Sequence, residues 1–514
     1  GPEPFKTRSD CEPPLHIHAL DGADFPVRLR GMYAIAIAEP GLGRLTLARD
    51  PFGIKPLYYT ENDLGFAFAS EPRALIEAGQ VGRELDAVRR DELLQVQFTS
   101  GAQTIFSGIK RVLPGQTLII EEGRLVSANQ RPALPSGPPE ERGDDEALAL
   151  LDEVLEDSVR VHQRSDVGYG MFLSGGIDSS ALLACMRDLN THPVKSFTAG
   201  FTGTGVADER DLASQVAKAA GADFQPVEFD KDDFWDLLPE ITACLDDPAA
   251  DYATLPTYKL GRVAREQGFK VILSGEGGDE LFAGYGRYRR MLRPRLLGGR
   301  PMRRDGILQG LGLLRQENRD WRAGLEAQAQ TQALPGRSRL QIAQATDCAD
   351  WLAHDLLLKL DRCLMAHGVE GRTPFLDPYV ASLAMGLPDR LKIRGRMGKY
   401  LLRCWLEGKL PQANPFSRKR GFTVPVAHWM AGEAKRLAPL MAAQPAIREI
   451  CDPDAVRALF ANLSPDGGRS SKQGQAAWVL LFYALWHRCH ISGLAADGDV
   501  FHCLDETGAR ALSD

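Results

Sequence analysis

Two glycine-rich segments carry the side chains whose types and spacing could do chemistry. The first spans residues 173–180 (LSGGIDSS), between a short apolar run and a helical stretch. Glycines let the backbone turn tightly there and approach a ligand closely. The amides that open the next helix, with the hydroxyls of Ser174 and Ser179, would form a cradle for an anion. An ordinary glycine-serine turn is the alternative. No lysine follows the glycines as in GxxxxGKS, and no GxGxxG occurs elsewhere, so the chain is neither a P-loop NTPase nor a dinucleotide-binding protein of that type.

The second segment spans residues 274–280 (SGEGGDE) and follows a predicted strand over residues 270–273. In open α/β sheets, ligands bind at the carboxyl ends of strands, so the two segments can face the same crevice. Asp178 and Asp279 would then be placed to hold Mg²⁺ against pyrophosphate, because magnesium commonly uses one or two carboxylates with phosphate oxygens and water. Glu276 remains to point at an acyl group. A solvated acidic loop is the alternative.

The elements that must position these segments change character along the chain. Residues 1–131 contain short alternating strands, for example over 32–37, 45–48 and 117–120, and predict a β-rich domain. A Pro/Gly-rich linker follows over 132–145. From residue 146, predicted strands over 169–173, 194–201, 225–229 and 270–273 alternate with helical stretches, which predicts a doubly wound parallel sheet. Beyond about residue 281 the pattern is mostly helical to residue 490, and 491–514 read as a C-terminal tail.

Together these motifs resemble the synthetase domain of the asparagine-synthetase family, a PP-loop ATP pyrophosphatase fold. Four further segments carry the resemblance: residues 358–367 (LKLDRCLMAH), 370–377 (EGRTPFLD), 399–403 (KYLLR) and 420–425 (RGFTVP). The resemblance implies Glu276, Lys399 and Arg403 as catalytic residues, with Lys399 and Arg403 one turn apart on one helix face. It implies Asp178 and Asp279 as magnesium ligands. It also implies contacts to ATP or pyrophosphate from Leu173, Ser174, Gly175, Gly176, Asp178, Ser179, Ala199, Ser274 and Gly275. Without the resemblance, Lys399 and Arg403 could be a solvated helix face.

Residues 1–131 resemble the later part of the family's N-terminal-nucleophile glutaminase domain, an αββα sandwich truncated at its start. The matching segments are 7–12 (TRSDCE), 29–34 (LRGMYA) and 48–59 (ARDPFGIKPLYY), and Asp10 corresponds to the carboxylate that binds the α-amino group of glutamine. The family's N-terminal cysteine nucleophile, an arginine and an Asn-Gly segment have no counterpart, since residue 1 is glycine and Cys11 lies in another segment. We therefore expect this chain to use ammonia, and the intact protein to use glutamine. We expect the missing stretch to be lost, cleaved or carried by another chain, because a sandwich without its first strands exposes open edges. An intact mass showing a native product that begins at Gly1 would count against this.

The implied reaction converts a carboxylate to an acyl-adenylate with ATP and Mg²⁺, after which ammonia attacks. Aspartate to asparagine is the default by analogy within the family. The same chemistry on a sugar carboxylate, or in a β-lactam or macrolactam synthetase, stays open. Two hypotheses from other functional classes are a tRNA-modifying PP-loop enzyme and an inactive interaction protein. The first would need a basic domain or reactive cysteines, and the second would need Asp178, Asp279 or Lys399 replaced. The resemblance is compatible with a homodimer.

Composition and charge argue against nucleic-acid and membrane partners, and small-molecule substrates are therefore expected. A net charge of −7, from 61 basic and 68 acidic residues, argues against a general nucleic-acid or membrane binder. The longest apolar run, over residues 476–486, is too short to span a bilayer and is best explained as a core helix. The nine cysteines contain no CxxC pair, which favours the cytoplasm. The arginines between residues 287 and 304 could cover phosphates or bind an acidic partner, but a solvated helix and loop is the preferred interpretation. A zinc site near residues 487–503 has no usual ligand spacing.

Overall fold

The computed structural model describes residues 5–202, 209–300, 302, 305–317, 320–417, 424–464 and 472–510. Most of the RGFTVP segment, residues 420–423, lies outside the described residues, as do Arg303 and Arg304. No helix among the described residues is long and apolar enough to cross a membrane.

The N-terminal part of the chain is built on two antiparallel sheets. The first, in the order β1-β2-β6-β7, contains β1 (Ala34–Glu39), β2 (Arg44–Arg49), β6 (Gln116–Glu121) and β7 (Arg124–Gln130). The second, in the order β4-β3-β5, contains β3 (Tyr58–Asn62), β4 (Gly65–Ala69) and β5 (Lys110–Arg111). Apolar side chains of both sheets share one cluster, in which Leu47 and Leu118 meet Leu57 and Tyr59. The sheets therefore pack face to face, and the strands expected over 32–37, 45–48 and 117–120 are confirmed as β1, β2 and β6.

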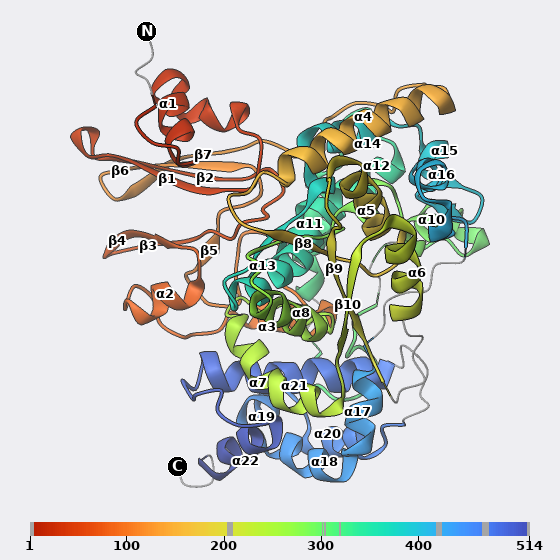
Figure 1. Cartoon of the computed structure of the whole chain (residues 1–514). Helices are drawn as coiled ribbons and strands as arrows, with labels where there is room; N and C mark the ends of the chain where they lie inside the picture. The colour runs from red at the N-terminus through yellow and green to blue at the C-terminus, as the bar shows by residue number, and fades with distance from the viewer. Residues whose placement is uncertain are drawn as a thin grey trace.

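Helices cover the outer faces of both sheets. Helix α1 (Glu12–Asp21) and the 3-10 helix η1 (Gly22–Arg28) lie over the first sheet, where Phe25 packs with Ile37 and Ala48. Helices α2 (Pro72–Glu77) and α3 (Ala87–Val96) lie by the second sheet, and Leu75 and Leu93 belong to the cluster that contains Tyr58. The result is four layers, helix, sheet, sheet and helix (Figure 1). That the domain is a truncated member of the N-terminal-nucleophile class stays a prediction.

The second half of the chain is organised around a five-stranded parallel sheet. Its order is β10-β9-β8-β11-β12, and every pairing is parallel. The strands are β8 (Tyr169–Phe172), β9 (Lys195–Gly200), β10 (Asp223–Glu228), β11 (Val271–Leu273) and β12 (Glu370–Arg372). The first four were predicted from the sequence. The fifth was missed, because β12 has only three residues and of these only Gly371 is buried.

Helices cover both faces of this sheet, so the doubly wound arrangement is confirmed. One face carries α4 (Asp144–His162), α5 (Ile177–Leu189), α6 (Arg210–Ala220), α14 (Pro378–Gly386) and α16 (Tyr400–Lys409). The other carries α8 (Thr254–Glu266) and α13 (Leu357–Met365). The chain runs outward from β8 to β9 and β10, then returns to the other side of β8 to form β11. The direction of winding thus switches between β8 and β11, which is where ligands bind in such sheets.

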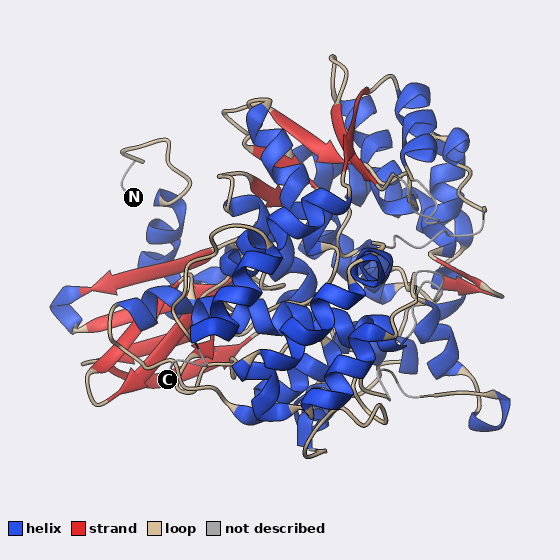
Figure 2. Cartoon of the chain, turned by 90° about the horizontal axis from the view of Figure 1, so that it is seen from below, coloured by secondary structure: helices blue, strands red, loops and turns tan. Residues whose placement is uncertain are grey.

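A helical region completes the chain around α7 (Lys231–Cys244) and α21 (Lys472–His490). Trp478, Leu481, Phe482 and Leu485 are buried, which confirms α21 as a core-packing helix. Helix α22 (Val500–Arg510) contacts α7 and α18 (Ala434–Ala443). Seen from below, the strands form two main groups with helices around and between them (Figure 2). The other helices and strands are α9 (Gly278–Leu281), α10 (Gly286–Leu292), α11 (Ala323–Thr331), α12 (Arg339–Ala349), α15 (Asp389–Lys392), α17 (Val426–Gly432), α19 (Pro445–Ile450), α20 (Pro453–Ala461), β13 (Ile393–Arg394) and β14 (Met397–Gly398).

Candidate active site

The first predicted loop joins the carboxyl end of β8 to the N-terminus of α5. Gly175 has a φ of 69°, a left-handed conformation that glycine adopts without strain, and Gly176 caps the helix. The hydroxyl oxygens of Ser174 and Ser179 lie 3.1 Å apart, and the backbone amide of Gly176 donates to Ser174 Oγ at 3.2 Å. These bonds hold the loop in shape at the start of a thirteen-residue helix, whose first amides have no hydrogen-bond partner within the helix.

The second loop follows β11 and touches the first. Ser274 is anchored by its amide, which donates to the carbonyl oxygen of Arg372 at 2.8 Å. A Cβ atom on Gly275 would lie 3.0 Å from Asp178 Cβ, and one on Gly278 would lie 2.4 Å from Asp178 Oδ1. Only glycine fits at position 278 without displacing this carboxylate. The two loops, which were predicted from the sequence to face each other, therefore meet at Asp178.

A buried lysine joins the two loops. Lys399 Nζ forms ion pairs with Asp178 and, at 2.6 Å, with Asp279 Oδ1. The side chain of Lys399 is 2% exposed, and the residue has a left-handed φ of 57° at the N-cap of α16. Burial lowers the pKa of Lys399, but the carboxylates of Asp178 and Asp279 outweigh burial, so the net shift is upward. A fixed positive charge thus lies between the two aspartates.

Asp178 and Asp279 suit a magnesium ion that phosphate oxygens would complete. Both are hard oxygen donors, and they converge on one cation, Lys399. Among the described residues, no group of three or more His, Cys, Asp or Glu side chains could hold a metal by itself. A two-carboxylate site with substrate phosphates fits this arrangement, because magnesium rarely uses an all-protein cage.

Arg403 lies on α16 one turn beyond Lys399, and its guanidinium contacts backbone carbonyl oxygens. Arg403 Nε donates to the carbonyl oxygen of Gly398 at 2.8 Å, and Nη1 donates to the carbonyl oxygens of Pro415 and Ser417. The structure therefore does not bring Arg403 into hydrogen-bond contact with the aspartates. It braces the backbone before and after α16.

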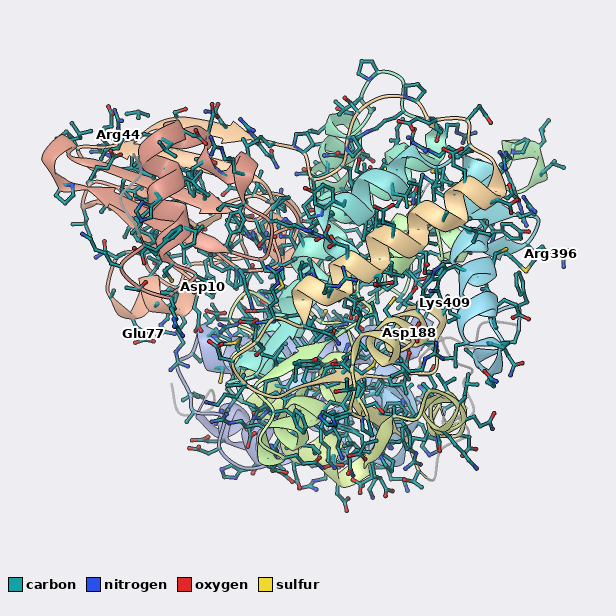
Figure 3. The ribbon with its side chains drawn as sticks, turned by 45° about the horizontal axis from the view of Figure 1, so that its top comes forward. Asp10, Arg44, Glu77, Asp188, Arg396 and Lys409 are labelled. Carbon is teal, nitrogen blue, oxygen red and sulfur yellow. The ribbon has the colours of Figure 1, made fainter. Side chains whose placement is uncertain are left out.

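The remaining predicted site residues lie in two parts of the molecule, at the carboxyl ends of the parallel strands and near the N-terminus. Leu173 and Ala199 are buried at the carboxyl ends of the neighbouring strands β8 and β9, and Glu276 is partly exposed at the end of β11. Asp10 is exposed in the turn before α1. Figure 3 shows Asp10 on the N-terminal part of the molecule, whereas Asp188 and Lys409 lie on α5 and α16. Asp10 is thus not brought together with the residues around Lys399.

Three charged residues near these loops, Glu280, Lys359 and Asp251, were not singled out from the sequence. Glu280 is 1% exposed, and burial together with Asp279 raises its pKa to about 8. Lys359, which is buried, forms an ion pair at 3.0 Å with the partly exposed Asp251. Lys359 belongs to the LKLDRCLMAH segment, and this was the available signal, but its partner lies 108 residues earlier. Arg287 is an exception to the interpretation of the basic run as solvated, because it pairs with Asp347 at 2.7 Å and lies 4.2 Å from the ring of Trp351. Arg290, Arg293 and Arg300 of the same run are exposed, as expected.

Comparison with known proteins identifies the family of this chain. A family model described as asparagine synthase matches residues 150–488. The chain belongs to the asparagine synthase family. Asparagine synthetase (glutamine-hydrolyzing) 1 of Bacillus subtilis is 31% identical over 95% of this chain and 82% of its own length. Asparagine synthetase B (glutamine-hydrolyzing) of Escherichia coli is 25% identical over 84% of this chain and 68% of its own.

Membership of the asparagine synthase family makes the protein an ATP-dependent carbon–nitrogen ligase. A second model, described as a glutamine amidotransferase domain, matches residues 2–130, the part that contains the two antiparallel sheets. The matched synthetase region contains both glycine-rich loops, Lys359 and Lys399.

Proposed function

We propose that this protein amidates a carboxylic acid through an acyl-adenylate, with aspartate as the acid and asparagine as the product. The observation that carries the proposal is the ion pairing of Lys399 with both Asp178 and Asp279 at the switch point of the parallel sheet. The names of the relatives, asparagine synthetases that hydrolyse glutamine, support the choice of product.

In the proposed reaction, a carboxylate oxygen of the acid attacks the α-phosphorus of ATP. The bond between the α-phosphorus and the bridging oxygen breaks, and pyrophosphate leaves. Ammonia then attacks the activated carbonyl carbon, the bond to the phosphate oxygen breaks, AMP leaves, and a proton is lost from nitrogen. Acid, ATP and ammonia thus give amide, AMP and pyrophosphate.

The residues of the crevice have distinct roles in this scheme. The β8–α5 loop binds the pyrophosphate part of ATP through backbone amides and the hydroxyls of Ser174 and Ser179. Asp178 and Asp279 would hold Mg²⁺, which neutralises charge on the departing pyrophosphate. Lys399, fixed before the reaction begins, stabilises negative charge that develops on phosphate oxygen. Glu276 lies at the acyl side of the crevice.

The test is an assay with ATP, Mg²⁺, aspartate and ammonium, in which AMP, pyrophosphate and asparagine are measured together. Lys399→Met should lower the rate at least ~100-fold, as for loss of a preorganised charge in other active sites. Lys409→Met is the matched control, because Lys409 ends the same helix and pairs with Asp152 at the surface. Equal activity of the two variants would contradict the proposed role of Lys399. Pyrophosphate release that ignores aspartate would exclude asparagine as the product.

A further inference from the structure

Lys359 is a buried lysine whose ammonium group has more N–H donors than hydrogen bonds to described residues. Its side chain is 5% exposed, and its one hydrogen bond to a described residue is to Asp251 Oδ2, at 3.0 Å. An ammonium group has three N–H donors, so two have no partner among the residues that the structure describes. Burial without partners is costly for such donors. The two N–H groups are thus available for a ligand.

Glu276 is the complementary group. Glu276 follows β11, which pairs with β12. Helix α13, which carries Lys359, packs against β12 through Leu360 and Leu364. Glu276 makes no hydrogen bond or ion pair within the described part of the chain. Burial raises the pKa of Glu276, and so do Asp251, Asp279 and Asp178, whereas the charge of Lys359 lowers it. Lys359 and Glu276 are therefore close enough for their opposite charges to act on each other.

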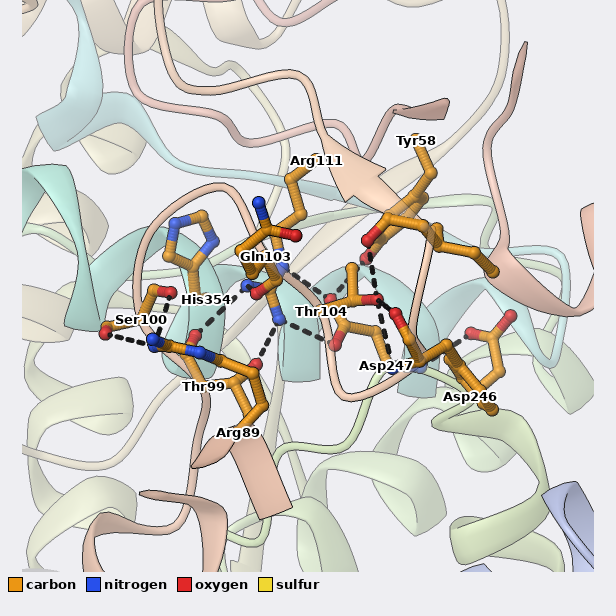
Figure 4. A network of polar contacts seen from close by, with 12 residues as sticks. Tyr58, Arg89, Thr99, Ser100, Gln103, Thr104, Arg111, Asp246, Asp247 and His354 are labelled. Atoms are coloured by element: carbon orange, nitrogen blue, oxygen red, sulfur yellow. Dashed lines mark hydrogen bonds and ion pairs between the residues drawn. The ribbon is translucent and has the colours of Figure 1, made fainter. Parts of the chain in front are cut away.

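Residues 246–251, which include the ion-pair partner of Lys359, are held in place by contacts to several parts of the chain. Asp251 follows the buried residues 246–250, at the end of the connection from α7. Ala250 donates its amide to Gln97 O at 2.7 Å, and its carbonyl oxygen accepts from Trp478 Nε1 at 2.6 Å. Asp247 forms an ion pair with Arg111 of β5 at 2.6 Å, within the network drawn in Figure 4. Contacts to both the N-terminal sheets and α21 thus fix the position of Asp251.

We propose that Lys359 and Glu276 form the selective end of the acyl-substrate site, where Lys359 donates to the non-reacting carboxylate of an α-amino acid and Glu276 accepts from its ammonium group. The proposal rests on the proposed function, because it takes the acid to be a dicarboxylic amino acid. A zwitterionic head group presents one anion and one cation, which match the charges of these two side chains. The second carboxylate of such a substrate is then free to extend toward the nucleotide.

The experiment compares aspartate with 3-aminopropanoate, which has the same chain and ammonium group but lacks the α-carboxylate. The KM for aspartate and the inhibition constant of 3-aminopropanoate against aspartate turnover are measured for the wild-type chain and for Lys359→Met. The KM for aspartate should rise about 10- to 100-fold, the loss typical of a hydrogen bond to a charged group. The inhibition constant should change less than about threefold, since 3-aminopropanoate never contacts Lys359. Lys359→Arg should recover part of the affinity for aspartate.

Lys259→Met is the matched control, because Lys259 lies on α8 and pairs with Asp233. It should leave both constants unchanged. Far-UV circular dichroism and ATP binding establish that Lys359→Met is folded, and Lys359→Arg serves as the test if it is not. Parallel weakening of aspartate and 3-aminopropanoate would overturn the inference and make Lys359 a structural partner of Asp251. A wild-type chain that does not turn over aspartate would instead overturn the proposed function.

Discussion

Arg111→Met should destabilise the protein strongly, because it removes one partner of a fully buried ion pair. Arg111 and Asp247 are 1% and 0% exposed, and the guanidinium contacts both carboxylate oxygens, at 2.7 Å to Oδ2 and 2.6 Å to Oδ1. Arg111 also donates to the carbonyl oxygens of Thr99, Gly101 and Gln103. The network joins the N-terminal sheets to the segment after α7 (Figure 4).

The magnitude follows from what is left behind. Breaking a buried ion pair by removing one partner typically costs about 3–5 kcal/mol, since the other charge stays buried without compensation. Tyr58 would still donate to Asp247 Oδ2, at 2.9 Å, so we expect a value near the lower end, about 3 kcal/mol. Adding Asp247→Asn removes the stranded charge and should recover at least about 1 kcal/mol.

The assay is urea unfolding followed by far-UV circular dichroism, with the change in midpoint multiplied by the shared slope. Arg44→Met is the control, because Arg44 and Glu121 form an ion pair that is 40% and 41% exposed. Such surface pairs contribute about 0–1 kcal/mol. If Arg111→Met shifts the midpoint no more than Arg44→Met, or if Asp247→Asn adds a further loss instead of a recovery, the reasoning is refuted.

Three further predictions concern the crevice. Gly278→Ala would place a Cβ atom 2.4 Å from Asp178 Oδ1 and should lower the rate of pyrophosphate release about 100-fold. Gly408→Ala is the control, because a Cβ atom there has no other atom within 4 Å, and it should leave the rate unchanged. Equal rates for the two variants would contradict the contact between the loops. Glu280, whose pKa burial raises from 4.5 to about 8, stabilises the fold while protonated. This contribution to stability is complete below the unfolded pKa of 4.5 and is lost as the pH rises toward 8. The urea midpoint of the wild type should therefore fall relative to that of Glu280→Gln between these pH values. A difference in midpoint that stays constant with pH would contradict a buried, protonated Glu280. Chelation of Mg²⁺ should stop pyrophosphate release until the ion is restored, and release without any divalent cation would contradict the roles of Asp178 and Asp279.

The sequence predicted those features that depend on local pattern. Two glycine-rich turns, each at the end of an apolar run, indicated the loops at β8 and β11, and parallel topology brings such ends together. The pattern could not reveal β12, because a three-residue strand carries no periodicity, and its place is set by pairing with β11.

Side-chain partners were harder to predict than positions. Helical spacing placed Lys399 and Arg403 on one face, but it could not show that Arg403 would be held by backbone carbonyl oxygens near residues 398 and 415. The ion pair of Lys359 with Asp251 joins residues 108 positions apart, so only the folded chain shows it. The same holds for Arg287, which looked solvated within a basic run but is enclosed by Asp347 and Trp351.

The central claim, adenylation of a carboxylate, is tested most directly by following isotopically labelled carboxylate oxygen. Aspartate labelled in its side-chain carboxylate is converted in the presence of ATP, Mg²⁺ and ammonium, and the nucleotide and phosphate products are analysed by mass spectrometry. An acyl-adenylate requires one labelled oxygen to remain on AMP after the amide forms, with pyrophosphate unlabelled. Label in orthophosphate, with ADP as the nucleotide product, would mean activation as an acyl phosphate and would contradict the proposed mechanism.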